Sequence, residues 1–229
     1  MKTSITLLAA ALAAGFVWQA VAQDSGSQRS RTPLDLPSGG GGRGDDDEDS
    51  PESITFYGAE FEGDAFFWCL DKSCSMGWAG EIQSLKQETS HALEQLSQQA
   101  QFALIAFSSN CVVWPASEQP ANATLANKSA AIGWVQEIVA SGETCLAPAI
   151  VKTIQIATVS TRPRRQILLL GDGVPYCGGV LSPTVLDDIH SANSEQIPIN
   201  TLYISVVPDG IPLFQAIAAE NSGTFTIVD

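Results

Sequence analysis

Three short stretches of the chain carry side chains that bind hard metal ions. Asp71, Ser73 and Ser75 lie in one loop, Thr144 lies in a second, and Asp172 stands between two glycines in a third. Together these residues offer two carboxylates and three hydroxyls, with no nitrogen or sulfur ligand. Such a set suits Mg²⁺ best, with Mn²⁺ or Ca²⁺ as alternatives, and suits zinc and copper poorly. The first chemical hypothesis is therefore a divalent-metal site.

The spacing of these residues is compatible with binding to a single ion. In a turn that follows a strand, alternate residues can point the same way, as the first loop requires. Gly77, Gly171 and Gly173 allow the tight backbone paths that a shared rim needs. The surrounding elements must then bring the three loops to one edge of the fold.

Continuous apolar runs predict strands that are buried on both faces, because they lack the alternation of a half-exposed strand. These runs occupy 66–70, 102–107, 166–170 and 199–205, with shorter strands expected at 54–57, 111–114 and 224–228. Helical spacing, proline starts and a terminal glycine predict the helices. They are expected at 82–96, 129–140, 182–193 and 212–222, and a further helix is expected to have Pro148 in its first turn.

Strands that alternate with helices predict an α/β fold. We expect a doubly wound, mostly parallel central sheet with helices on both faces. The link 108–110 is short enough for a hairpin, so the strand at 111–114 is expected to be antiparallel and at an edge. Ligand sites in such sheets form outside the carboxyl ends of the strands, which is where the predicted loops lie.

The motif Asp71-x-Ser73-x-Ser75-Met76, with Thr144 and Asp172-Gly173, resembles a known site. It is similar to the metal-ion-dependent adhesion site (MIDAS) of von Willebrand factor type A domains. The resemblance covers 54–229, and all five site positions are filled in order. Cys74 replaces a common glycine, and Gly171 stands where threonine or serine is usual, but neither change removes a ligand.

This resemblance implies a role for each of the five residues. Ser73 and Ser75 would bind the metal through their hydroxyls, and Thr144 would bind it directly or through water. Asp71 and Asp172 would act mostly through bound waters and hydrogen bonds. One coordination position would stay open for an Asp or Glu side chain of a protein partner. The chain is therefore expected to be a metal-dependent protein-binding module rather than an enzyme.

The N-terminal residues predict export. A basic start, an apolar run over 5–18 and the small residues Ala20 and Ala22 have the order of a secretory signal, expected to span 1–22. Residues 23–53 are rich in glycine and aspartate and are expected to form a disordered tether. The protein would then be secreted, to the exterior or a periplasm, with no membrane span in its mature chain.

Charge argues against nucleic acid as a partner. The chain has 11 basic residues against 25 acidic ones, a formal net charge of −14. No group of Lys or Arg residues is dense enough to neutralise a run of phosphates. The composition instead predicts a globular, acidic and soluble protein.

Five cysteines leave at least one thiol unpaired within the chain. Cys69 lies in a buried strand and is expected to be an inert core thiol. Cys74, Cys145 and Cys177 lie in or beside the site loops. We expect Cys74 to bridge to Cys145 or Cys177, with three reduced thiols as the alternative.

Two other functions remain as alternatives. A phosphatase could use Asp71, but it normally carries a second acid two positions later, where this chain has Ser73. His91 and His190 are expected to be surface or packing residues, and no nucleophile-elbow motif supports a serine hydrolase. The third hypothesis is a structural surface protein with a non-functional site. No catalytic residue and no organic cofactor is predicted.

Overall fold

A parallel sheet forms the centre of the domain in the computed structural model, which describes residues 50–205 and 207–228. The strand order is β11-β10-β7-β3-β4-β5, with β6 also beside β4. All pairs are parallel except those of β5 and β6 with β4. The strands are β3 (Ala65–Asp71), β4 (Gln101–Phe107), β5 (Cys111–Trp114), β6 (Ala121–Asn122), β7 (Arg165–Gly171), β10 (Ile199–Tyr203) and β11 (Phe225–Ile227). The predicted fold class and the antiparallel edge strand are confirmed.

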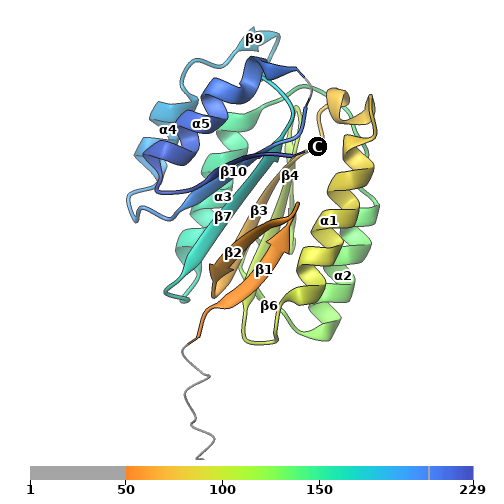
Figure 1. Cartoon of the computed structure of the whole chain (residues 1–229), viewed down its shortest axis with the longest axis vertical. Helices are drawn as coiled ribbons and strands as arrows, with labels where there is room; N and C mark the ends of the chain where they lie inside the picture. Colours follow the sequence, from red (N-terminus) through yellow and green to blue (C-terminus); the bar gives the residue numbers. More distant parts are fainter. Residues whose placement is uncertain (1–49, 206, 229) are drawn as a thin grey trace, which may run out of the picture. The chain divides into compact units, whose positions relative to one another are not determined.

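Helices cover both faces of this sheet (Figure 1). They are α1 (Glu81–Gln95), α2 (Leu125–Gln136), α3 (Leu146–Val159), α4 (Val185–Ala192) and α5 (Ile211–Glu220). Helices α1 and α2 share one apolar cluster with the sheet, whereas α3, α4 and α5 share the other. The two clusters make this a three-layer fold with a separate core on each side of the strands.

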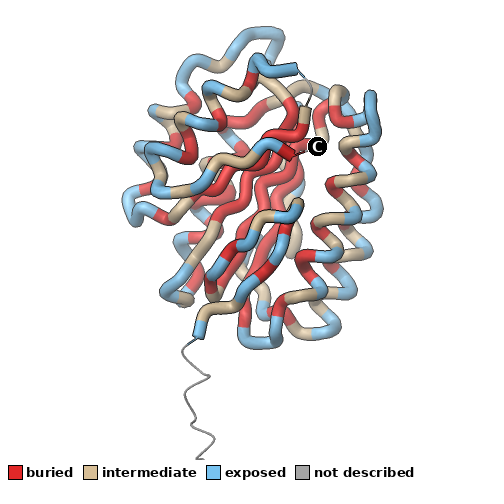
Figure 2. The backbone as a smooth tube through the Cα atoms, viewed as in Figure 1, coloured by how far each residue is buried: buried red, intermediate tan, exposed pale blue. Residues whose placement is uncertain are grey.

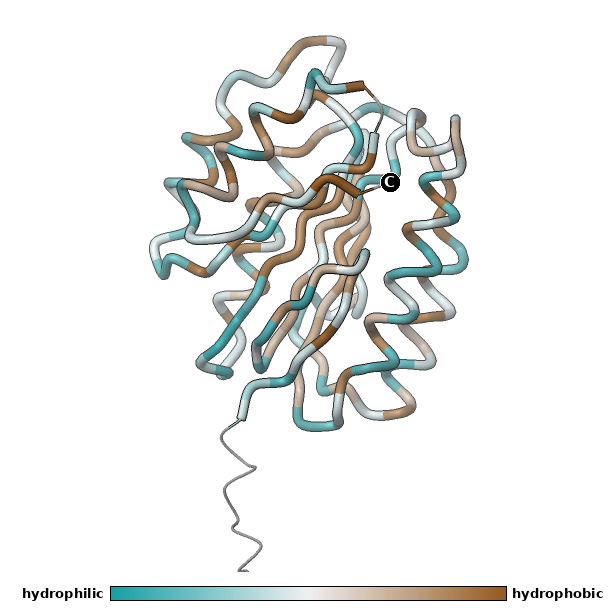
Figure 3. The backbone as a smooth tube through the Cα atoms, viewed as in Figure 1, coloured by the Kyte–Doolittle hydropathy of each residue, from teal (hydrophilic) through white to brown (hydrophobic). Residues whose placement is uncertain are grey.

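Strand β3 shows why the continuous apolar runs become central strands. All seven of its residues are buried (Figure 2). Phe66 and Trp68 face the α1 side, while Phe67 and Cys69 face the α3 side, because successive side chains of a strand alternate. The apolar colouring of the central strands in Figure 3 reflects this demand for apolar residues on both faces.

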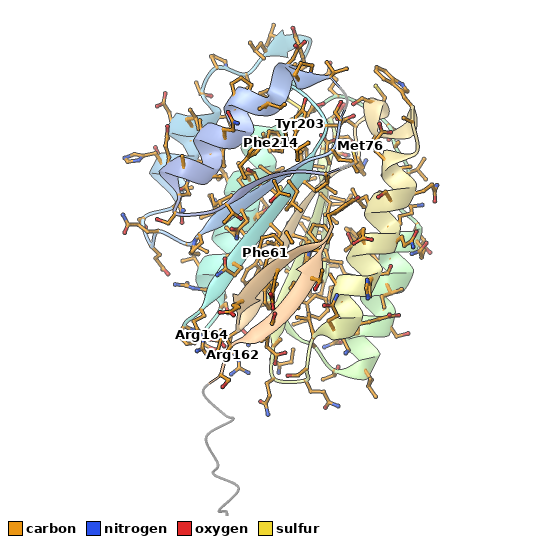
Figure 4. The ribbon with its side chains drawn as sticks, in the orientation of Figure 1. Phe61, Met76, Arg162, Arg164, Tyr203 and Phe214 are labelled. Carbon is orange, nitrogen blue, oxygen red and sulfur yellow. A yellow bond between two sulfur atoms is a disulfide. The ribbon has the colours of Figure 1, made fainter. Side chains whose placement is uncertain are left out.

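Two hairpins were not predicted as such. In the first, β1 (Glu52–Phe56) pairs antiparallel with β2 (Ala59–Gly63) through Tyr57 and Gly58, both at positive φ. Its inward side chains, including the Phe61 labelled in Figure 4, join the α1-side core. The second hairpin joins β8 (Tyr176–Cys177) to β9 (Val180–Leu181).

Several predicted boundaries were wrong by a few residues. Helix α2 begins at Leu125 and ends at Gln136 rather than spanning 129–140. The Thr124 hydroxyl accepts a hydrogen bond from the Asn127 amide at 3.2 Å, and this cap sets the earlier start. Helix α4 begins at Val185 rather than at Ser182. These differences lie at helix ends, where local capping decides the first turn.

The predicted signal peptide (1–22) and nearly all of the predicted tether (23–53) lie outside the described residues. The last tether residues, Glu52 and Ser53, belong to β1. Among the described residues, no helix combines the length and the apolar character that crossing a bilayer requires.

Replacement of Phe56 tests whether the first hairpin is part of the core. This side chain is fully buried and makes an edge contact with the Trp68 ring, with centroids 6.4 Å apart. We expect Phe56→Ala to lower the free energy of unfolding by about 3–5 kcal/mol in urea titrations, because it leaves a cavity. Thr55→Ala changes the exposed face of the same strand and should cost less than about 1 kcal/mol. Equal effects of both changes would contradict this assignment.

Candidate metal centre

Two aspartates meet at one edge of the sheet because their strands are parallel neighbours. Strands β3 and β7 pair with Leu70 opposite Leu170. Asp71 is the last residue of β3, and Asp172 directly follows the last residue of β7. Both side chains are buried, with 1% and 7% of their surface exposed. The sheet therefore places two carboxylates in one poorly solvated region.

The serine hydroxyls link these carboxylates. The Ser73 amide donates a hydrogen bond to the Asp71 carboxylate at 2.7 Å. The hydroxyls of Ser73 and Ser75 lie 3.1 Å apart, and the Ser75 hydroxyl donates to the Asp172 carboxylate at 2.9 Å. Four of the five predicted site residues thus form one connected set of oxygen atoms.

A buried methionine anchors the loop that carries the serines. Residues Cys74–Gly77 form a 3₁₀ helix, and its Met76 is fully buried in the α1-side core (Figure 4). The Lys72 amide donates to the Phe107 carbonyl of the neighbouring strand at 2.8 Å. The loop is therefore attached to the fold on both sides of Ser73, so the positions of its hydroxyls follow from core packing.

Thr144 lies on an adjoining loop that is joined to the first one through the backbone. The Ser141 amide donates to the Lys72 carbonyl at 2.8 Å, and the Cys74 amide donates to the Gly142 carbonyl at 3.0 Å. The half-buried Thr144 hydroxyl makes no hydrogen bond with any described residue. The structure thus brings its loop to the site, whereas the other four residues are linked through their side chains.

Tight packing explains the glycine that precedes Asp172. A Cβ atom on Gly171 would lie 2.9 Å from the Phe214 ring and 3.2 Å from an Asp71 carboxylate oxygen. Phe214 is itself buried and packs edge-on against Tyr203, with centroids 5.2 Å apart (Figure 4). The departure from the usual threonine or serine therefore leaves room for Phe214.

Burial makes both carboxylates difficult to ionise. The pKa of Asp71 is raised to about 7, chiefly by loss of solvation; hydrogen bonds from Ser73 and the Asp172 amide oppose the shift, and the charge of the nearby Asp172 adds to it. Burial likewise raises the pKa of Asp172 against the hydrogen bond from Ser75. A divalent cation would offset both effects, because it attracts the two negative charges. The donor set and its electrostatics therefore fit a hard divalent metal.

The cysteine pairing was predicted wrongly. The structure joins Cys145 to Cys177, with Cα atoms 4.7 Å apart, and leaves Cys74 as an exposed free thiol. The Thr144 amide donates to the Tyr176 carbonyl at 2.8 Å. This backbone contact places the next residues of the two segments, Cys145 and Cys177, side by side. Cys69 is a buried free thiol, as expected.

The β8–β9 hairpin and its contact with Glu143 were missed in the sequence. The Glu143 carboxylate accepts hydrogen bonds from the amides of Gly178 at 2.6 Å and Gly179 at 3.1 Å. The Cys-Gly-Gly turn between two short apolar pairs was the available signal, since both glycines adopt positive φ. His91 and His190 lie on exposed helix surfaces, away from this region, as predicted.

Alanine at Gly171 tests the packing around the site. We expect Gly171→Ala to lower the free energy of unfolding by about 1–3 kcal/mol, because the new methyl group overlaps Phe214. Gly173→Ala is the matched control, since a Cβ atom there meets nothing within 4 Å. Its stability should equal or slightly exceed that of the parent in the same urea titrations. A silent Gly171→Ala substitution would contradict the packing argument.

The raised pKa of Asp71 predicts that the free energy of unfolding, measured with a metal chelator present, depends on pH. Its pKa of about 7 in the folded protein exceeds the ordinary pKa of 3.8 for an aspartate side chain. The stabilisation that this group contributes is therefore fully present below pH 3.8 and is lost as the pH rises through about 7. Asp71→Asn removes this titration, so its stability relative to the parent should rise by about 3 kcal/mol between pH 5 and pH 8. If the free energies of unfolding of the parent and of Asp71→Asn, measured in denaturant, changed with pH in the same way, the raised pKa of Asp71 would be contradicted.

No protein-family model matches the sequence, and no curated protein matches it either. Solved structures do match the fold. A von Willebrand factor type A protein from Catenulispora acidiphila shares 20% identity over 74% of this chain and 40% of its own, with a TM-score of 0.62. The open conformation of the pilus adhesin SpaC from Lactobacillus rhamnosus GG shares 14% identity over 72% and 28%, with a TM-score of 0.58.

A third similar structure is proximal thread matrix protein 1 from the mussel byssus, solved with a zinc-occupied MIDAS motif. It shares 16% identity over 72% of this chain and 44% of its own, with a TM-score of 0.52. This chain thus spans less than half the length of each of these three proteins. At such identities the likeness concerns the fold alone, and the chain has the fold of a von Willebrand factor type A domain.

Proposed function

We propose that this chain is a secreted protein-binding module that depends on a divalent metal ion. The observation that carries the proposal is the connected set of Asp71, Ser73, Ser75 and Asp172 at adjacent strand ends. Thr144, on the adjoining loop, would complete the group that holds the ion. The bound metal would supply a positive charge that attracts a carboxylate of the partner.

Magnesium is the proposed ion, with Mn²⁺ or Ca²⁺ as alternatives. All five side chains offer oxygen atoms, the ligands that these hard cations prefer. The serine hydroxyls are neutral, and the two carboxylates would act mostly through water. A cation held in this way keeps much of its positive charge, which favours an acidic ligand from another molecule.

Two further observations support binding outside the cell. The sequence begins with the features of a secretory signal, and the Cys145–Cys177 disulfide suits an oxidising compartment. The similar structures include a pilus adhesin and a matrix protein of the mussel byssus. The position two after Asp71 holds Ser73 rather than the second acid that a phosphatase of this kind normally carries, which favours binding over hydrolysis.

Calorimetric titration of the purified full chain with Mg²⁺ tests the metal site. We expect saturable binding by the parent protein and loss of that binding in Asp172→Asn, because the amide removes a buried negative charge and keeps the shape. Asp187→Asn is the matched control, since this carboxylate is exposed on α4 and lies away from the site. Its Mg²⁺ titration should match that of the parent.

The open coordination position has a separate readout. Paramagnetic Mn²⁺ should enhance the relaxation of water protons when it is bound, because exchangeable water would occupy the free position. An acidic peptide that occupies this position should reduce the enhancement. Absence of Mg²⁺ and Mn²⁺ binding, or equal binding by Asp172→Asn, would refute the proposed function.

A further inference from the structure

Exposed apolar side chains gather on the loops around the metal centre. Of the ten large hydrophobic residues that are most exposed in the described part of the chain, six lie on these loops. We call them the apolar collar: Trp78, Val139, Tyr176, Val180, Leu181 and Val207. Trp78, with 80% of its surface exposed, is the largest and most exposed member. Apolar groups that cluster in this way around a polar centre mark interaction sites.

Backbone contacts place the collar beside the site residues. The Trp78 amide donates to the Ser75 carbonyl at 2.9 Å, and the Tyr176 carbonyl accepts from the Thr144 amide at 2.8 Å. Val207 lies on the loop after β10, where its carbonyl accepts from the Tyr203 hydroxyl at 2.5 Å. The collar therefore includes residues from the serine loop, from the hairpin beside Thr144 and from the loop after β10.

Three collar residues lie on a constrained hairpin. Tyr176, Val180 and Leu181 belong to β8–β9, which the Cys145–Cys177 disulfide ties to the start of α3. The Glu143 carboxylate also accepts hydrogen bonds from both glycine amides of the turn. A hairpin whose turn is held in this way loses little conformational freedom when a partner binds, which favours affinity.

The charges near the site limit which partners fit. Glu81 begins α1 directly after the serine loop, where its carboxylate accepts a hydrogen bond from the Ala79 amide at 2.9 Å, and Glu143 and Asp209 lie on loops that adjoin the site. Lys72 is a basic residue of the serine loop, but its ammonium is directed to the Ser108 hydroxyl, to which it donates a hydrogen bond at 2.8 Å. The metal would then be the main attraction for an acidic group, and a run of acids or an anionic membrane would be repelled by the carboxylates around it.

We propose that the collar and the metal form one docking surface for a segment of another protein. That segment presents a single Asp or Glu flanked by large aliphatic or aromatic side chains. The carboxylate completes the metal shell, and the flanking side chains bury apolar area against Trp78 and the β8–β9 hairpin. This inference rests on the proposed function, because it assigns the partner chemistry of the same site.

Selection from a phage-displayed library of random peptides tests the inference. The immobilised full chain is incubated with the library in Mg²⁺, and bound phage are eluted with chelator. We expect the enriched peptides to share one Asp or Glu with large apolar residues on either side. If calorimetry still shows Mg²⁺ binding, two results would overturn the proposed role of the collar. One is enrichment of acidic peptides with polar flanks, and the other is the absence of any enriched peptide in the chelator eluate. Loss of Mg²⁺ binding itself would refute the proposed function instead.

Substitutions in the collar separate its role from that of the metal. We expect Trp78→Ser and Leu181→Ser each to weaken binding of the strongest selected peptide by about tenfold, with the Mg²⁺ titration unchanged. Leu125→Ser is the matched control, because Leu125 is 72% exposed at the start of α2 and outside the collar. Peptide binding that is unaffected by both collar variants would overturn the proposal.

Two further measurements exclude other occupants. Co-sedimentation with vesicles of phosphatidylcholine and phosphatidylserine in Mg²⁺ should show no binding. Light scattering should show no Mg²⁺-dependent dimer. Vesicle binding or dimerisation that Trp78→Ser abolishes would assign the collar to a membrane or to a second copy of the chain, and would overturn the proposal.

Discussion

The structure around the candidate site depends on two carboxylates that parallel strands bring together in a buried region. Asp71 ends β3 and Asp172 directly follows the adjacent β7, and burial raises the pKa of each. Without a cation, this arrangement opposes folding near neutral pH, because ionisation must occur where water is largely excluded. The rest of the domain must therefore supply enough stability to hold the pair in place. The two apolar clusters on either side of the sheet provide that stability.

Features far apart in the sequence serve this arrangement. Gly171 leaves room for Phe214 beside Asp71, and Met76 anchors the serine loop in the core. The Cys145–Cys177 disulfide and the Glu143 carboxylate hold the β8–β9 hairpin next to the Thr144 loop. The candidate binding surface is thus built on attached loops, and its proposed specificity comes from the apolar residues that these loops expose.

Much of the fold could be predicted because strong local patterns carry it. The central strands are apolar along their whole length, as β3 illustrates, and the short 108–110 link correctly indicated an antiparallel edge strand. The strand at 54–57 was expected, but its partner β2 and the β8–β9 hairpin were missed, because β2 holds one large core residue and β8 and β9 have two residues each. The predicted cysteine pairing was wrong because Cys74, Cys145 and Cys177 all lie in or beside the site loops, so their positions in the sequence do not distinguish them. Only the spatial arrangement of their loops shows which two can bond.

The sequence by itself determined the α/β alternation and the set of oxygen-bearing residues that share one rim. Both follow from local rules: an apolar run predicts a buried strand, and the residues after parallel strands meet at one edge. Tertiary structure alone decided the links between Ser75 and Asp172, the room beside Gly171, the Cys145–Cys177 bond and the grouping of the apolar collar. These features join segments that are distant in the chain. Their geometry depends on how the loops pack, which no local pattern encodes.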